Sequence, residues 1–139
     1  MKLLLPLLLV CAALLSGCAT TSQRVLDLGD ETQLQKRSYQ SRIFETADKE
    51  KVLRAVISTL QDLGFVIDRA DFMLGTISAT KQDRNQIRIT VSARPKGNDR
   101  MLVRANAQLN ISPIEDPKEY QNFFSSLEKS LFLTAHAGE

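Results

Sequence analysis

The chain has 139 residues, of which 43% are hydrophobic, and it carries 18 basic and 16 acidic residues. That length fits one small domain together with a leader or a tether. The near balance of charge provides no extended cationic surface for nucleic acid, so we expect no nucleic-acid partner.

The first 17 residues have the layout of an export signal. The basic Lys2 precedes an apolar run over 3–15, and the small residues Ser16 and Gly17 come next. A charged start, a short apolar run and small residues in this order are typical of a signal peptide. A helix that spans a bilayer needs about 20 apolar residues, and this run is shorter. We therefore predict that 1–17 is a signal peptide that is absent from the mature protein.

The next residue is Cys18, and its setting predicts lipidation. The stretch LSGC resembles the lipobox of bacterial lipoproteins, in which the cysteine carries acyl chains and becomes the first mature residue. The resemblance implies a membrane anchor of N-terminal acyl chains, and Ala19 implies the outer membrane, with the domain facing the periplasm. The alternative is an ordinary secretory signal with a cysteine near its cleavage site. Because Cys11 leaves with the signal, no thiol remains for a disulfide, a metal or a nucleophile.

A polar stretch separates Cys18 from the predicted domain. It has no sustained helical or strand period, so we predict that 18–40 is the lipidated cysteine and a flexible linker, with a short helix across part of it as the alternative. A single α+β domain is predicted over 41–139. Its first segment, 41–45, is expected to be a short strand.

A helix is predicted from Thr46 to Leu63. Thr46 is the expected N-cap, and Asp48 and Glu50 place negative charge in the first turn, where the helix dipole favours it. Gly64 suits the left-handed position that ends a helix. The apolar residues at helical spacing form one stripe: Val52, Leu53, Val56, Leu60 and Leu63.

The segments that follow predict an antiparallel sheet. The extended stretch over 65–81 is expected to be one strand with a bend near 68–71 or two short strands, and Gly75 marks a bulge or a close approach of two backbones. Two strands with alternating apolar and polar residues are predicted over 86–94 and 101–111. The residues expected to face inward are Ile87, Ile89, Val91, Ala93, Val103, Ala105, Ala107, Leu109 and Ile111. Because the opposite positions are polar, we expect the sheet to be covered on one side only.

A second amphipathic helix ends the domain. Asp116 is its expected N-cap, and Pro117 fits its first position. Its apolar stripe consists of Tyr120, Phe123, Phe124, Leu127 and Leu131, and Phe132 adds a further aromatic ring to the expected core. Both helices must bury their stripes, and the sheet offers one apolar face. We therefore predict a two-layer sandwich, in which two helices pack on one face of an antiparallel sheet of three to four strands.

The stretch LQDLGFVIDRADFMLGTISATK carries a family resemblance. It combines a helix that ends in Leu-Gly-Phe, a strand with an aspartate-containing bend, and a glycine before the next extended segment. This pattern resembles the helix-grip domains of the BamC family, accessory lipoproteins of the β-barrel assembly machinery, and the resemblance covers about 41–133. It implies the sandwich fold and the lipoprotein class, and it assigns no binding residue.

The sequence offers few groups for catalysis. His136 is the only histidine and lies near the C-terminus, so a Ser-His-Asp or zinc arrangement lacks parts. Four carboxylates lie in predicted bends or at a helix start, where acidic residues serve turns and caps: Asp68, Asp71, Glu115 and Asp116. We expect no enzyme activity, no cofactor and no metal site.

Five polar residues on the open face of the sheet are the predicted binding site: Arg88, Thr90, Arg94, Arg104 and Asn106. Guanidinium groups beside hydrogen-bonding side chains suit carboxylate or phosphate groups of a partner. The alternative interpretation is a sheet face that is only solvated. An exposed strand edge offers another route, the addition of a strand from a partner.

These observations predict a non-catalytic outer-membrane lipoprotein that acts as a periplasmic scaffold or protein-interaction module with a partner in the cell envelope. The alternative is a lipoprotein that binds a small molecule or lipid between its helices and its sheet. A cavity lined by Phe72, Phe123 and Phe124 would favour that alternative.

Overall fold

The computed structural model describes the backbone of residues 33–136 and the side chains of residues 33–132. The predicted signal peptide, Cys18 and the first part of the predicted linker lie outside the described residues. Contacts along the chain define a compact unit that begins at Lys36, and the fold below is that of this unit.

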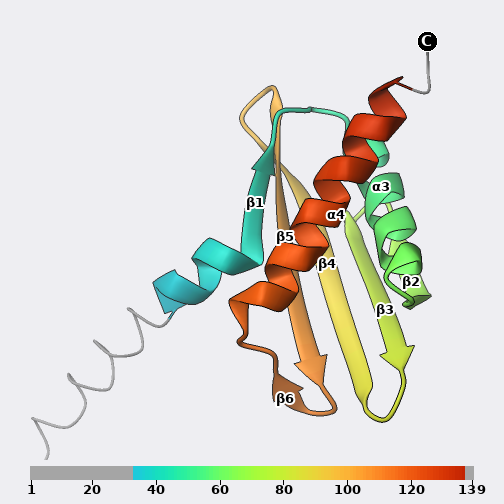
Figure 1. Ribbon diagram of the computed structural model, residues 1–139. Coiled ribbons are helices and arrows are strands. Elements are labelled where there is room, and N and C mark those ends of the chain that lie inside the picture. The colour runs from blue at the N-terminus through green and yellow to red at the C-terminus, as the bar shows by residue number, and fades with distance from the viewer. Residues whose placement is uncertain (1–32, 137–139) are drawn as a thin grey trace, which may run out of the picture. The chain divides into compact units, whose positions relative to one another are not determined.

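The centre of the domain is an antiparallel sheet in the order β1-β5-β4-β3-β2, with β6 beside β5 (Figure 1). The strands are β1 Ser41–Phe44, β2 Val66–Asp71, β3 Thr76–Gln82, β4 Gln86–Lys96, β5 Arg100–Leu109 and β6 Ser112–Pro113. The helices α3 (Lys49–Asp62) and α4 (Pro117–His136) cover one face of this sheet, and residues 33–40 are also helical. The predicted α+β class with an antiparallel sheet is confirmed. The described residues form six strands and three helices, whereas three to four strands and two helices were predicted.

The strands beyond the predicted number come from two places, the stretch 65–81 and the residues after β5. The stretch 65–81, which we predicted to be one strand bent near 68–71 or two short strands, forms two strands in a hairpin, and its turn lies over 72–75, between β2 and β3. The carboxylate of Asp71 accepts a hydrogen bond from the backbone N–H of Leu74 (2.9 Å), which places the turn after the predicted position. The other addition is β6, which pairs with the end of β5.

The start of α3 lies later than predicted. Its N-cap is Asp48, whose side chain accepts a hydrogen bond from the N–H of Lys51 (2.9 Å). Thr46 instead accepts a hydrogen bond from the N–H of Asp48 (3.2 Å) and shapes the turn before the helix. Because a carboxylate also interacts favourably with the helix dipole, Asp48 is the better cap of the two.

The other predicted helix ends are confirmed. Gly64 has a φ of +83°, and the N–H groups of Gly64 and Phe65 bond to carbonyls in the last turn of α3, which is the Schellman arrangement. At the start of α4, Asp116 accepts a hydrogen bond from the N–H of Lys118 (2.9 Å), and Pro117 is the first helical residue.

The inner face of the sheet and the stripes of both helices form one core. Its buried residues are Phe44, Val52, Leu53, Ala55, Val56, Leu60, Ile77, Ala79, Ile89, Val91, Ala93, Met101, Val103, Ala105, Tyr120, Phe123, Phe124 and Leu127. Three predicted core positions are exposed: Leu109 is 38%, Ile111 92% and Phe132 64% exposed. Four others are partly buried: Leu63, Ile87, Ala107 and Leu131. β5 ends at Leu109 and the chain turns there, while Phe132 lies one position beyond the apolar stripe of α4.

Part of the predicted linker belongs to the domain, because Tyr39 and Gln40, at the end of the helical segment 33–40, contact Tyr120 of α4. The ring of Tyr39 lies 5.3 Å from the Tyr120 ring, centroid to centroid, and Gln40 Nε2 donates a hydrogen bond to the Tyr120 hydroxyl (3.3 Å). That hydroxyl also donates to the carbonyl of Ile114 (2.8 Å) and accepts from the N–H of Ala107 (3.1 Å). One phenol thus connects the helical segment, β5, the start of α4 and the loop before it.

Candidate functional site

The five predicted binding residues lie on the face of the sheet that no helix covers. In the register of β4 and β5, Thr90 lies directly opposite Asn106, Arg88 opposite Gln108, and Arg104 opposite Ser92. All five predicted side chains are exposed, and the residues that alternate with them along β4 and β5 are buried beneath the helices: Ile89, Val91, Ala93, Val103 and Ala105. The structure therefore brings this set together on two adjacent strands, as the alternation predicted.

The arginines of this face are poorly neutralised. Within residues 33–136, the guanidinium groups of Arg88 and Arg94 take part in no ion pair or hydrogen bond, and Arg104 donates only to the hydroxyl of Ser41 (3.3 Å). The carboxylates on this side belong to the edge strand β2. There Asp68 accepts a hydrogen bond from the Thr80 hydroxyl (2.6 Å). The centre of the face, formed by β4 and β5, is therefore cationic and free to contact an external anion; we call it the open face.

The four carboxylates considered for catalysis have structural partners. Asp68 accepts a hydrogen bond from Thr80, and Asp71 accepts one from the turn after β2. Asp116 caps α4. Glu115 forms an ion pair with Lys36. The contacts of Asp71 and Asp116 fit the turn and cap roles that the sequence indicated, whereas Asp68 lies within β2 and Glu115 forms an ion pair instead.

Groups suited to metal binding do not gather in the described part of the chain: between residues 33 and 136, no three His, Cys, Asp or Glu residues lie close enough together to hold a metal ion. The side chain of His136 lies outside the described residues. In the same range, no helix is long and apolar enough to cross a bilayer.

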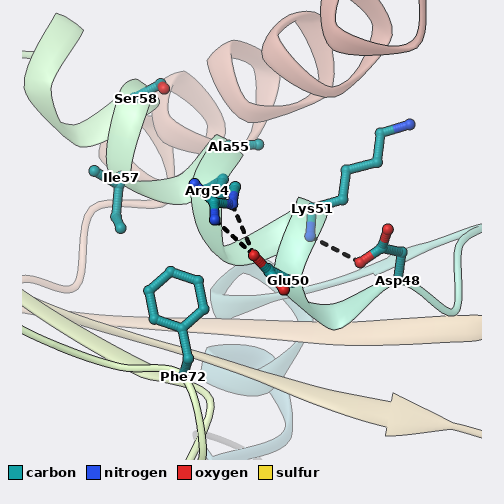
Figure 2. A pocket seen from close by; sticks show the side chains of 8 residues that line it. All are labelled: Asp48, Glu50, Lys51, Arg54, Ala55, Ile57, Ser58 and Phe72. Carbon is teal, nitrogen blue, oxygen red and sulfur yellow. Dashed lines mark hydrogen bonds and ion pairs between the residues drawn. The ribbon is translucent and has the colours of Figure 1, made fainter. Parts of the chain in front are cut away.

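The three phenylalanines proposed to line one cavity do not share one, although the rings of Phe123 and Phe124 contact each other with their centroids 5.1 Å apart. Phe124 is fully buried in the core. Phe72 sits on the β2–β3 turn and faces α3 across a solvent-open cleft, whose charged groups largely bind one another (Figure 2). There Arg54 pairs with Glu50 (2.6 Å), and Asp48 caps the helix. The cleft therefore presents no converging reactive groups.

An apolar pocket lies at the other end of α3, between α4 and the sheet, and the sequence prediction of a cavity between helices and sheet named only Phe123 of its lining. Its volume is about 410 Å³. It is lined by Leu63, Phe65, Lys81, Ile87, Ile89, Ala107, Leu109, Ile114, Glu119, Tyr120, Asn122 and Phe123. One sequence feature indicates this pocket. The inward-facing apolar positions of β4 and β5 continue to Ile87 and Leu109, at the level of the sheet where α3 ends. Of the three phenylalanines, only Phe123 reaches this pocket.

Two ionisable groups in the helical segment 33–40 have shifted pKa values. The hydrogen bond from Lys36 to Glu115 is the main cause that raises the pKa of the Lys36 ammonium above its usual value. Burial is the main cause that raises the pKa of the Tyr39 phenol. Both shifts belong to the attachment of this segment to the domain rather than to the open face.

No protein-family model and no curated protein matches this chain. Fold and site geometry are therefore the basis for assigning a function.

Proposed function

We propose that this chain is a non-catalytic, lipid-anchored lipoprotein of the bacterial outer membrane, whose periplasmic domain is an interaction module for an acidic surface of an envelope protein. The observation that carries this proposal is the open face. Arginines without acidic partners stand there beside hydroxyl and amide groups on two adjacent strands. The BamC-like pattern and the lipobox-like stretch ending at Cys18 support the same class of protein.

The open face favours a protein partner because its groups are spread rather than converging. Arg88 and Arg104 lie on different strands, separated along the sheet by the row of Thr90 and Asn106. A flat array of this kind matches several carboxylates on another surface, and arginine binds carboxylates through paired hydrogen bonds. The strands that carry these side chains are packed on the core. The binding groups are therefore held on a rigid backbone when a partner binds.

The first test is photo-crosslinking in intact cells. A photoreactive residue is placed in turn at Thr90 and Asn106 on the open face and at Lys129, an exposed position on α4. We expect a discrete protein adduct from the first two positions and none from Lys129. Adducts from all three positions, or from none, would contradict the proposal.

Charge reversal tests whether the arginines hold the partner. Arg88→Glu together with Arg104→Glu should abolish the crosslink from Thr90, because two attractive contacts become repulsive. Lys129→Glu is the matched control with the same kind of charge reversal on α4, and it should leave the crosslink intact. All substituted side chains are exposed, so unfolding free energies should change by less than about 0.5 kcal/mol. An undiminished crosslink in the double variant would exclude the open face as the binding surface.

A further inference from the structure

The apolar pocket exists because the sheet is longer than the helix that covers it. α3 ends at Asp62, and the carbonyl of Leu63 lies 3.0 Å from the ammonium of Lys81 on β3. Lys81 pairs with Ile87, and Ile87 pairs in turn with Leu109, so this row of the sheet lies at the end of the helix. Ile87 and Leu109 point inward but remain partly exposed. They leave apolar surface without a protein partner inside a concave site.

The size and lining of the pocket suit a small ligand. Its volume of about 410 Å³ is within the range of small-molecule sites, which are mostly apolar with few polar groups. Residues of β4 and β5 form the floor, which includes the small side chain of Ala107, and Phe65 and Phe123 of α4 also line the pocket. An occupant would remove the partly exposed side chains of Phe65, Ile87 and Leu109 from water.

One cation marks the polar end of the ligand. The Lys81 side chain is partly buried, its ammonium lies 5.9 Å from the centroid of the Phe65 ring, and it has no ion-pair partner within the described residues. A partly buried ammonium beside apolar groups gains free energy from an anion. The hydroxyl of Tyr120 is already engaged with backbone groups and is not available to a ligand.

The second charged group of the pocket limits the charge of the ligand. Glu119 is exposed in the first turn of α4, where the helix dipole stabilises its carboxylate. A ligand with two negative charges would meet this carboxylate, so a monoanion fits better.

We propose that this pocket binds a small monoanionic amphiphile, with its apolar body against Phe65, Ile87 and Phe123 and its acidic group at Lys81. The site lies on the helix side of the sheet, opposite the open face. It is independent of the proposed protein interaction, and either proposal can fail without the other.

The test uses the full chain and the dye 8-anilino-1-naphthalenesulfonate, which combines aromatic rings with one sulfonate. We expect saturable binding of one dye per chain. Dodecanoate should displace the dye, and dodecanol should need a concentration about ten-fold higher, because it lacks the charge that Lys81 binds. Absence of saturable binding, or equal displacement by the two compounds, would overturn the proposal.

Variants then locate the site. Lys81→Met keeps an apolar stem without the charge, so it should remove the difference between dodecanoate and dodecanol. Asn122→Glu places a carboxylate at the pocket, whereas Gln121→Glu makes a similar change on the neighbouring exposed residue outside it. The first should weaken dodecanoate several-fold with little effect on dodecanol, and the second should change neither at physiological salt.

The volume of the site is tested separately. Ala107→Leu fills the floor and should weaken both compounds. If Ala107→Leu fails to fold, the variants Asn122→Glu and Gln121→Glu test the location of the bound molecule. Both positions are exposed on α4, so these variants should fold. Equal affinities for dodecanoate in Asn122→Glu and Gln121→Glu would place the bound molecule elsewhere and refute this pocket.

Discussion

At the scale of single residues, Gly75 shows how two strands impose a residue type on the chain. Its φ is +71°, and its carbonyl accepts a hydrogen bond from the N–H of Ala93 (2.8 Å). A Cβ added at this position would lie 2.5 Å from the carbonyl oxygen of Ala93. The position therefore excludes a side chain both by its backbone conformation and by a backbone atom that cannot move without breaking the sheet.

Gly75→Ala should destabilise the protein by about 3 kcal/mol, because left-handed strain and a backbone clash add together. Gly97 is the matched control: its φ is +72°, but an added Cβ would meet no atom within 4 Å. Gly97→Ala should therefore cost only about 1 to 2 kcal/mol, from the strain alone. Urea unfolding of the two variants measures the difference. Equal losses would mean that the close approach to Ala93 contributes nothing.

At the scale of elements, the helical segment 33–40 changes where the domain begins. Tyr39 packs on Tyr120, and Lys36 forms an ion pair with Glu115 before the start of α4. The folded state raises the pKa of both Lys36 and Tyr39. In alkaline solution the folded state thus binds more protons than the unfolded state. The stabilisation is complete below the unfolded pKa values, near 10, and is lost as pH rises through the folded ones.

This linkage predicts a pH dependence that one substitution can isolate. Tyr39→Phe keeps the ring contact with Tyr120 but removes the titrating phenol, so its stability should fall less steeply above about pH 9 than that of the unmodified protein. Free energies of unfolding in urea between about pH 8 and pH 11 provide the measurement. Parallel curves for the two proteins would contradict a pKa shift at Tyr39.

At the scale of the whole molecule, the domain presents two different surfaces on opposite sides of one sheet. The open face carries arginines without acidic partners, and the helix side carries the apolar pocket. Residues between these layers are closely packed, so each surface rests on a common rigid core. Placed on an acyl anchor, such a domain would meet its partner close to a membrane, where a tether raises the effective concentration.

The intact mass of the protein tests the proposed acyl anchor. The full chain is expressed in a bacterium with the lipoprotein pathway and extracted from membranes. Its mass should equal that of a chain starting at Cys18 plus added acyl groups. Cys18→Ser removes the thiol that would carry the lipid, and this variant should not acquire the added mass. An unmodified Cys18 in the membrane-extracted protein would refute the lipoprotein assignment while leaving the domain fold untouched.

Local patterns in the sequence determined α3 and α4, the C-terminal end of α3, the start of α4 and the two faces of the central strands, but not the start of α3 or the helix over 33–40. The stripe of α4, the glycine end of α3 and the alternation along β4 depend on neighbouring residues, since helix and strand periods are set by backbone geometry. The alternation within each strand also predicts that Arg88 and Arg104 face away from the core, whichever strands pair.

Tertiary structure alone decided the features that join distant residues. Nothing near Tyr120 in the sequence indicates that its hydroxyl will bind Gln40 and Ala107, and the pocket at Lys81 appears only once the length of α3 is compared with that of the sheet. The short β6 and the turn after β2 likewise depend on pairing or hydrogen bonding that a periodic pattern does not encode. The physical reason is that periodicity fixes which way a side chain points, whereas only packing fixes what it meets there.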